Sequence, residues 1–288
     1  MKQRIISGVI IAAMIVGFGL IGGYALAILI MICSMIGYQE LVRATGVLEE
    51  GEKKNLITVI GHCMAVVLYL GIMAVHARHG QDAGQAVLLS DFFTVIVIVL
   101  AFLAMMTAYV LTFPKFKSEQ VMETFFSFIY APILMSFVVR SRFLPYGLFM
   151  YAMIFVCSSV CDTCALAAGM AFGRHKMAPV LSPKKTVEGA IGGVIGSALC
   201  SVLLSLILKA VNPGADYKIQ FLVIGMFGAL ISMVGDLAAS AIKRNHGIKD
   251  YGNLIPGHGG IMDRFDSIIF TAPLINILGV FLLGTVSL

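Results

Sequence analysis

Long runs of uncharged, apolar residues restrict the fold of this chain more than any other feature. The first run extends from Ile5 to Gln39 without a charged side chain. Of the 288 residues, 59% are hydrophobic and 12% are charged, about half the charged fraction of an ordinary soluble domain. Runs of this length cross a bilayer as helices, and they are continuous rather than alternating. We therefore predict an all-α, polytopic integral membrane helix bundle.

About nine transmembrane helices are expected in a single membrane-embedded domain over residues 1–288, with N-terminal helices in 1–139 and motif-bearing helices in 146–288. The N-terminus resembles a signal peptide, with Ala25-Leu-Ala27 as a cleavage-like site. However, its apolar run is too long for that role, so we expect two retained helices that separate near Gly22 and Gly23. The predicted spans are 5–21, 24–44, 55–76, 90–112, 121–139, 146–171, 187–209, 219–242 and 264–286.

The distribution of Lys and Arg predicts the orientation. With a cytoplasmic N-terminus, fifteen of the 20 basic residues fall on the cytoplasmic side and five on the other, in agreement with the positive-inside rule. This orientation puts the polar segments 172–186 and 243–263 on the cytoplasmic face. The five outer residues are Arg78, Arg140, Arg142, Lys209 and Lys218.

Two acids, Asp162 and Asp236, lie inside apolar spans. A carboxylate at the bilayer centre costs about 3 kcal/mol on insertion scales, so such residues are functional candidates. A helix-packing hydrogen bond or a snorkelling position is the alternative for each. Asp236, Ser240, Lys243 and Arg244 share one helix face by their spacing, although the two basic residues could simply anchor the helix at the interface.

Basic residues, glycines and carboxylates are concentrated between Ser240 and Ser267. Asp263 and Asp266 are one turn apart at the start of the last predicted helix. There they could cap the helix dipole or hold a hard cation such as Mg²⁺. The preceding Pro256-Gly-His-Gly-Gly260 turn could converge backbone N–H groups on an anion, or be merely flexible.

A second polar cluster follows Asp162. Ser182-Pro-Lys-Lys-Thr186 combines cations and hydroxyls directly before a predicted helix, and helix N-termini bind phosphate readily. A juxtamembrane patch touching anionic lipid is the alternative. Glu188 either caps that helix or serves as another ligand.

Six cysteines all fall in apolar runs and give no disulfide framework. Cys157, Cys161 and Cys164 share a helix face, where small residues typically form helix interfaces; a metal or redox site is the alternative.

The clusters together favour phosphoryl or nucleotidyl transfer, which needs metal, positive charge and positioning more than a covalent nucleophile. Three alternatives stay open: a transporter, another lipid-linked transferase and a non-catalytic scaffold. A transporter would place its site near the midplane, often with repeated broken helices. Against the second alternative, the sequence lacks the aspartate-rich signatures of CDP-alcohol or polyprenyl-phosphate phosphotransferases.

At these residues the chain resembles the phosphatidate cytidylyltransferase family. The family's C-terminal signature, Ser-x-x-Lys-Arg-x4-Lys-Asp-x-Gly-x3-Pro-Gly-His-Gly-Gly-x-x-Asp-Arg-x-Asp, is met from Ser240 to Asp266. Its upstream feature, an intramembrane Asp followed by Gly-Arg and Ser-Pro-Lys-Lys-Thr-x-Glu-Gly, is met from Asp162 to Gly189. One departure is Leu166, where many relatives have an aromatic residue.

The resemblance implies that CTP and phosphatidic acid react to CDP-diacylglycerol and pyrophosphate at the cytoplasmic face of the plasma (inner) membrane. It implies Mg²⁺, leaves a second cation open, and implies membrane lipids and a homodimer, but no nucleic acid, as partners. Asp236 and Asp263 are the predicted metal ligands, with Asp266 in support. Lys243, Arg244, Lys249 and Arg264 are predicted to neutralise phosphates. Either the triphosphate or the lipid headgroup is predicted to be held by Ser182, Lys184, Lys185 and Thr186. The predicted phosphate loop is shaped by His258, Gly259 and Gly260. The predicted substrate-binding set also includes Asp162, Glu188, Ser240 and Asp250.

Overall fold

A computed structural model of the protein describes residues 2–48, 52, 54–255, 257 and 259–284. Within this part of the chain, eight helices are long and apolar enough to cross a membrane, and α1 (Lys2–Ile21) adds a shorter apolar stretch over Gly8–Ile21. Regular strand in the same residues is confined to one short hairpin. The predicted all-α, multi-pass membrane fold is confirmed, while the cytoplasmic N-terminus stays a prediction.

The chain divides into two compact units. The first unit comprises Met1–Phe143 and His246–Arg264, and the second comprises Leu144–Asn245 and Phe265–Leu288. The motif loop 246–264 therefore groups with the N-terminal helices, although in sequence it lies between the two segments of the second unit. A single catalytic domain, with its parts 1–139 and 146–288, stays a prediction.

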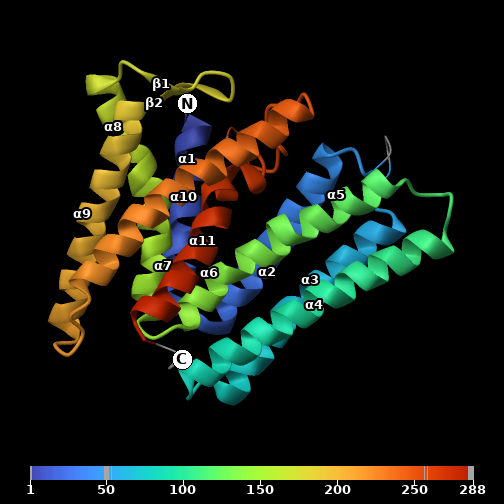
Figure 1. The fold of residues 1–288 in the computed structure, drawn as a ribbon, viewed down its shortest axis with the longest axis horizontal. Coiled ribbons are helices and arrows are strands. Elements are labelled where there is room, and N and C mark those ends of the chain that lie inside the picture. The colour runs from blue at the N-terminus through green and yellow to red at the C-terminus, as the bar shows by residue number, and fades with distance from the viewer. Residues whose placement is uncertain (1, 49–51, 53, 256, 258, 285–288) are drawn as a thin grey trace. The chain divides into compact units, whose positions relative to one another are not determined.

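Helices of the first unit agree closely with the predicted spans (Figure 1). Gly22 and Gly23 have φ angles of 63° and 54° and separate α1 from α2, as predicted, because glycine adopts positive φ at no steric cost. One helix begins at Ala83 instead of near residue 90, because the Asp82 side chain accepts a hydrogen bond from the backbone N–H of Gln85 and caps it. The elements are α2 (Gly23–Ala44), α3 (Leu56–His79), α4 (Ala83–Leu111), and α5 (Ser118–Phe128) joined through a π-helical turn (Ile129–Ile133) to α6 (Leu134–Phe143).

In the second unit, α8, α9 and α10 pack side by side (Figure 1). One π-helical turn (Val156–Val160) joins two helices into a single span, Gly147–Phe172. The hairpin follows that span and leads directly into the next helix. The elements are α7 (Gly147–Phe155), α8 (Cys161–Phe172), β1 (Lys176–Ala178), β2 (Ser182–Thr186), α9 (Val187–Val211), α10 (Lys218–Asn245) and α11 (Met262–Leu282), the last belonging to this unit from Phe265 onward.

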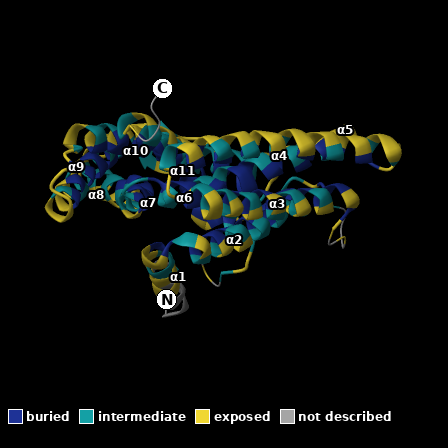
Figure 2. Ribbon diagram, turned by 90° about the horizontal axis from the view of Figure 1, so that it is seen from below, coloured by how far each residue is buried: buried dark blue, intermediate teal, exposed yellow. Residues whose placement is uncertain are grey.

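Small residues form the packed face of α9. Every fourth residue from Gly189 to Ser205 is a buried glycine or serine, whereas large apolar residues such as Ile191, Ile195 and Leu199 are exposed. Figure 2 shows α9 with both buried and exposed residues along its length. Lipid is as apolar as these side chains, so helices associate through close packing of small residues and leave large ones facing the bilayer. The exposed apolar positions are therefore the expected lipid-facing surface.

Three cysteines take part in the same kind of packing. A Cβ added to Gly193 would lie 3.0 Å from the Sγ of Cys161, so the two backbones approach closely only without a side chain at that position. The interpretation of these cysteines as small interface residues is confirmed. The contacting pairs are Cys157 with Gly228, Cys161 with Gly193 and Cys164 with Gly196.

Candidate active site

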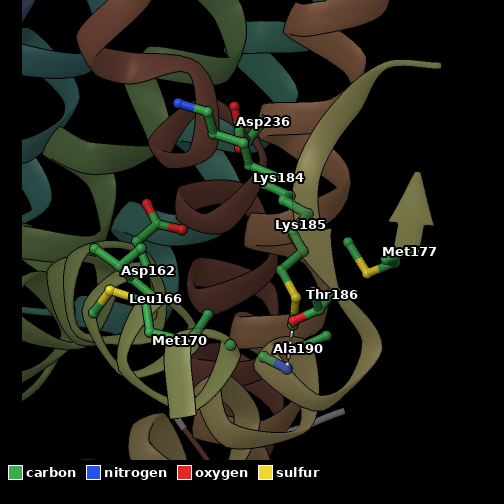
Figure 3. Close-up of a pocket in the computed structure, with 13 residues that line it drawn as sticks. Asp162, Leu166, Met170, Met177, Lys184, Lys185, Thr186, Ala190 and Asp236 are labelled. Atoms are coloured by element: carbon green, nitrogen blue, oxygen red, sulfur yellow. Dashed lines mark hydrogen bonds and ion pairs between the residues drawn. The ribbon is translucent and has the colours of Figure 1, made fainter. Parts of the chain in front are cut away.

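A cavity of about 440 Å³ lies in the second unit, bounded by α8, the β-hairpin, the start of α9 and α10 (Figure 3). We call it the α8–α10 cavity. It combines two carboxylates and two lysines with methionine, leucine and alanine side chains. Its lining residues are Asp162, Ala165, Leu166, Gly169, Met170, Met177, Lys184, Lys185, Thr186, Gly189, Ala190, Met233 and Asp236.

The hairpin brings the lysines to this cavity. Strands β1 and β2 pair antiparallel, with Lys176 opposite Thr186 and Ala178 opposite Ser182. The sequence does not predict these strands, because short, charged strands that contain a proline lack the apolar alternation that identifies a strand. Ser182, at the far end of β2, is not among the lining residues of the cavity.

Thr186 connects the hairpin to α9. Its hydroxyl accepts a hydrogen bond of 3.1 Å from the backbone N–H of Gly189 and caps the helix, which begins at Val187 as predicted. The side chain also packs against Gly169 and Gly173, where an added Cβ would approach its Oγ1 to 3.0 Å. These contacts hold the hairpin against the end of α8 and so fix the lysines that precede Thr186.

Lys185 forms an ion pair with Asp236 on α10. Both side chains are half-buried, with 24% and 28% exposure, so the ammonium group offsets much of the cost of a carboxylate in an apolar span. Asp162, on α8, lines the same cavity. The sequence identified each of these residues as a candidate, but not the pairing, because 51 positions separate Lys185 from Asp236.

Glu188 lies outside the α8–α10 cavity lining. Its carboxylate accepts hydrogen bonds from the backbone N–H groups of Arg174 and His175, at 3.0 and 3.2 Å, and lies 2.6 Å from Nδ1 of His175. These contacts hold the backbone that follows α8, whereas α9 is capped by Thr186; the two roles considered for Glu188, helix cap or ligand, stay predictions.

The predicted polar stripe on α10 is continuous. Asp236, Ser240, Lys243 and Arg244 all lie within Lys218–Asn245, so they share one helix face as expected. One residue before Asp236, the backbone of α10 comes close to α11: a Cβ added to Gly235 would lie 2.8 Å from the carbonyl oxygen of Asp266. Within the second unit the fold therefore brings Asp236 and the turn at Asp266 together.

A second assembly, in the first unit, is built around the carboxylate of Asp263. Its Oδ2 accepts hydrogen bonds from the backbone N–H groups of Tyr251, at 2.8 Å, and Gly260, at 3.0 Å. Asp263 is 6% exposed. The motif loop closes over it with a bridge from Ile255 to Gly259, in which the Ile255 N–H donates to the Gly259 carbonyl at 2.8 Å. Asp263 therefore organises the glycine turn.

Glu40 was missed by the sequence interpretation. Its carboxylate oxygens accept hydrogen bonds from the backbone N–H groups of Ile261, at 3.0 Å, and Met262, at 2.9 Å, where α11 begins. The residue is 7% exposed and so caps α11 from another helix, α2. The sequence does contain a signal for Glu40, because it is an acid inside the predicted span 24–44. The same criterion identified Asp162 and Asp236 as candidates.

The remaining predicted site residues lie in the second half of α10, in the motif loop and in the first turns of α11. Ser240 and Lys243 are half-buried, and Arg244, Lys249, Asp250 and Arg264 are exposed. Asp266 accepts a hydrogen bond of 2.7 Å from the Ser267 backbone N–H. His258 lies outside the described residues. Within those residues there is no group of three or more His, Cys, Asp or Glu side chains arranged to hold a metal, so a metal in the α8–α10 cavity would rely on two carboxylates together with substrate oxygens.

The fold and this cavity define a polytopic membrane protein in which acids of the apolar spans adjoin the lysines of a hairpin, an arrangement suited to phosphate chemistry. The chain belongs to the cytidylyltransferase family, whose model matches residues 2–282. It is 30% identical over 281 residues to a phosphatidate cytidylyltransferase of Bacillus subtilis (strain 168), covering 96% of this chain and 97% of the relative. A phosphatidate cytidylyltransferase of Staphylococcus aureus (strain COL) is 32% identical over 285 residues, covering 96% and 98% of the two chains.

Proposed function

We propose that this protein transfers the cytidylyl group of CTP to the phosphate of phosphatidic acid, forming CDP-diacylglycerol and pyrophosphate. The observation that carries this proposal is the α8–α10 cavity, where two acids and two lysines adjoin the apolar side chains of Leu166, Met170 and Met177. Such a lining suits a phosphate attached to an acyl-bearing lipid. Relatives of nearly the same length that are named phosphatidate cytidylyltransferases support the same reaction.

The nucleophile in this reaction is the lipid itself. A phosphate monoester has a second pKa of about 6 and is mostly dianionic at neutral pH, so no strong general base is required. An oxygen of the lipid phosphate forms a bond to the α-phosphorus of CTP, and the bond from that phosphorus to the oxygen bridging to the β-phosphate breaks. Pyrophosphate takes away the electron pair. The main barrier is repulsion between two anions, which fixed positive charge lowers.

Lys184 and Lys185 supply such charge in the α8–α10 cavity. The ammonium group of Lys185 pairs with Asp236, and an entering phosphate would compete with that carboxylate for it. The neighbouring N-terminus of α9, capped by Thr186, adds a favourable dipole. We therefore assign these groups to the lipid phosphate, which can enter without leaving the bilayer.

The proposed cofactor is Mg²⁺, with Asp162 and Asp236 of the α8–α10 cavity as its protein ligands. Two carboxylates completed by phosphate oxygens are a donor set that this ion prefers. When bound, it would neutralise phosphate charge and polarise the phosphoryl group. The sequence-based roles of Asp263 as a ligand and Asp266 as its support, and any second cation, stay predictions.

We further propose the cell membrane as the location and its cytoplasmic face as the side of the active site, on the basis of the distribution of Lys and Arg. CTP and phosphatidic acid are the proposed substrates, and membrane lipids surround the protein. The homodimer implied by the family resemblance stays a prediction, which cross-linking in membranes would test.

Incubation of the purified protein with labelled CTP, phosphatidic acid and Mg²⁺ tests the reaction. Label should enter the organic phase only when phosphatidic acid is present, and EDTA should abolish the transfer until Mg²⁺ is added in excess. Diacylglycerol without its phosphate is the matched control and should accept no label. Absence of transfer under all these conditions would refute the proposed function and favour a transporter or scaffold.

A further inference from the structure

The turn of the β-hairpin carries an exposed apolar side chain outside the membrane spans. Val180 is 87% exposed, more than any other large apolar side chain that the structure describes. Pro179 beside it is exposed and Leu181 is half-buried. We call residues 179–181 the hairpin tip. Exposed apolar residues on the spans face lipid, but the tip lies in the connection between two spans, so the lipid around the spans does not account for it.

The hairpin lies at the level where these two spans end. β1 begins four residues after Phe172, and β2 ends directly before Val187. Figure 1 shows the hairpin leaving the ends of α8 and α9 sideways rather than continuing along their axes. The headgroup region is about 5–8 Å deep on each side of the hydrocarbon core, whereas the five residues of β2 extend over about 17 Å. An upright hairpin would leave that region, but one that runs sideways stays within reach of lipid headgroups.

The hairpin is also positively charged. Residues 174–188 contain four Lys and Arg side chains and one acid, Glu188. Two of the four cations line the α8–α10 cavity, and the other two, Arg174 and Lys176, do not. Neither of these two forms an ion pair with a residue that the structure describes, and the Glu188 carboxylate is engaged by two backbone N–H groups and a histidine ring. An anionic membrane surface attracts such a segment.

We propose that the hairpin docks on an anionic lipid surface, with its tip between the headgroups and with Arg174 and Lys176 on lipid phosphates. Segments that lie in a membrane interface combine apolar side chains with Lys and Arg in this way. Lipid is already present at this level, because both neighbouring spans cross the bilayer. Docking would hold the hairpin at a fixed depth, and with it Lys184 and Lys185 at the α8–α10 cavity. The inference depends on the membrane fold and not on the proposed reaction.

Tryptophan fluorescence tests the hairpin tip, because the chain contains no Trp. Full-length Val180→Trp is reconstituted into vesicles of phosphatidylcholine, alone or mixed with phosphatidylglycerol, with brominated acyl chains that quench a tryptophan in contact with them. Phosphatidic acid is left out, so that binding of a substrate does not contribute. We expect blue-shifted emission, and stronger quenching when phosphatidylglycerol is present. Adding Arg174→Gln and Lys176→Gln should weaken docking by about 30-fold, about fivefold for each cation, and reduce the quenching to its level in phosphatidylcholine alone.

Two other positions calibrate the signal. Leu199→Trp, on the lipid-facing side of α9 with 66% exposure, should be quenched equally in both kinds of vesicle. Gly214→Trp lies in the exposed turn before α10, where the nearby cation Lys209 is paired with Asp216, and it should be quenched in neither.

Emission and quenching of Val180→Trp that match those of Gly214→Trp would overturn the inference. Equal quenching with and without phosphatidylglycerol would overturn it as well, since the proposed surface is anionic. Blue-shifted emission without quenching would assign the hairpin tip to a protein surface and refute docking on lipid. If Val180→Trp fails to insert into vesicles, Pro179→Trp provides a second position on the same tip and is judged by the same outcomes.

Discussion

Glu40→Gln tests whether a carboxylate on α2 holds the start of α11. Glu40 is 7% exposed, and each of its two oxygens accepts one backbone N–H, from Ile261 and from Met262. Glutamine keeps one acceptor and turns an amide NH₂ toward the other N–H. A buried donor left without a partner costs about 1–3 kcal/mol. We therefore expect local destabilisation of about 2 kcal/mol at the junction of the motif loop and α11.

Hydrogen exchange measures this change where it occurs. Because each 1.4 kcal/mol corresponds to a factor of ten, the amides of residues 259–262 should exchange about 30-fold faster in Glu40→Gln, and faster still in Glu40→Ala. Exchange in α9, in the other unit, should be unaffected if the opening is local. We also expect turnover to fall, because the glycine turn before α11 would lose one of its two attachments.

Glu119→Gln is the matched control. Glu119 is an exposed acid in the first turn of α5, so its charge contributes only to the helix dipole, by about 0.3–1 kcal/mol. Exchange at residues 259–262 should not respond to this change. Unaltered exchange at those residues in Glu40→Gln itself would refute the capping role.

Three further substitutions test the site. Lys185→Met, which removes the partner of Asp236, should lower kcat by about 100-fold or more, with partial recovery in Lys185→Arg; normal turnover in both would exclude the lysine from the reaction. Gly259→Ala should lower both the melting temperature and kcat more than Gly247→Ala. Both positions have positive φ, 81° and 65°, so alanine at either costs about 1–2 kcal/mol of backbone strain. Only at Gly259 would the new Cβ meet a neighbour, Asp263 Oδ2 at 2.7 Å. Equal effects of the two changes would contradict the proposed packing. Asp263→Asn should nearly abolish turnover and leave membrane insertion intact, because the amide oxygen can still accept the two backbone hydrogen bonds but the neutral side chain loses the charge that the predicted metal ligand needs; near-normal activity in detergent would remove Asp263 from the mechanism.

Most of the helical architecture follows from the sequence, because a bilayer leaves the backbone few choices. A peptide group in lipid must find its hydrogen bond within its own segment, so each long apolar run is a helix. The break at Gly22 and Gly23 and the start of α9 after Thr186 were also predicted, because each depends on residues that are close together in the sequence. Errors occurred where a single side chain moved a boundary, as Asp82 does at the start of α4.

The reaction class was also readable from the sequence, because charged residues are rare in apolar spans and those retained there mark sites. Tertiary structure alone decided which of them act together. Lys185 pairs with Asp236, and Glu40 with the start of α11, across 51 and more than 200 positions of chain. Hydropathy and helical periodicity describe only neighbours within a few residues. Contacts between distant elements depend instead on how the helices pack, which the small residues of α9 and α10 determine through their close approach.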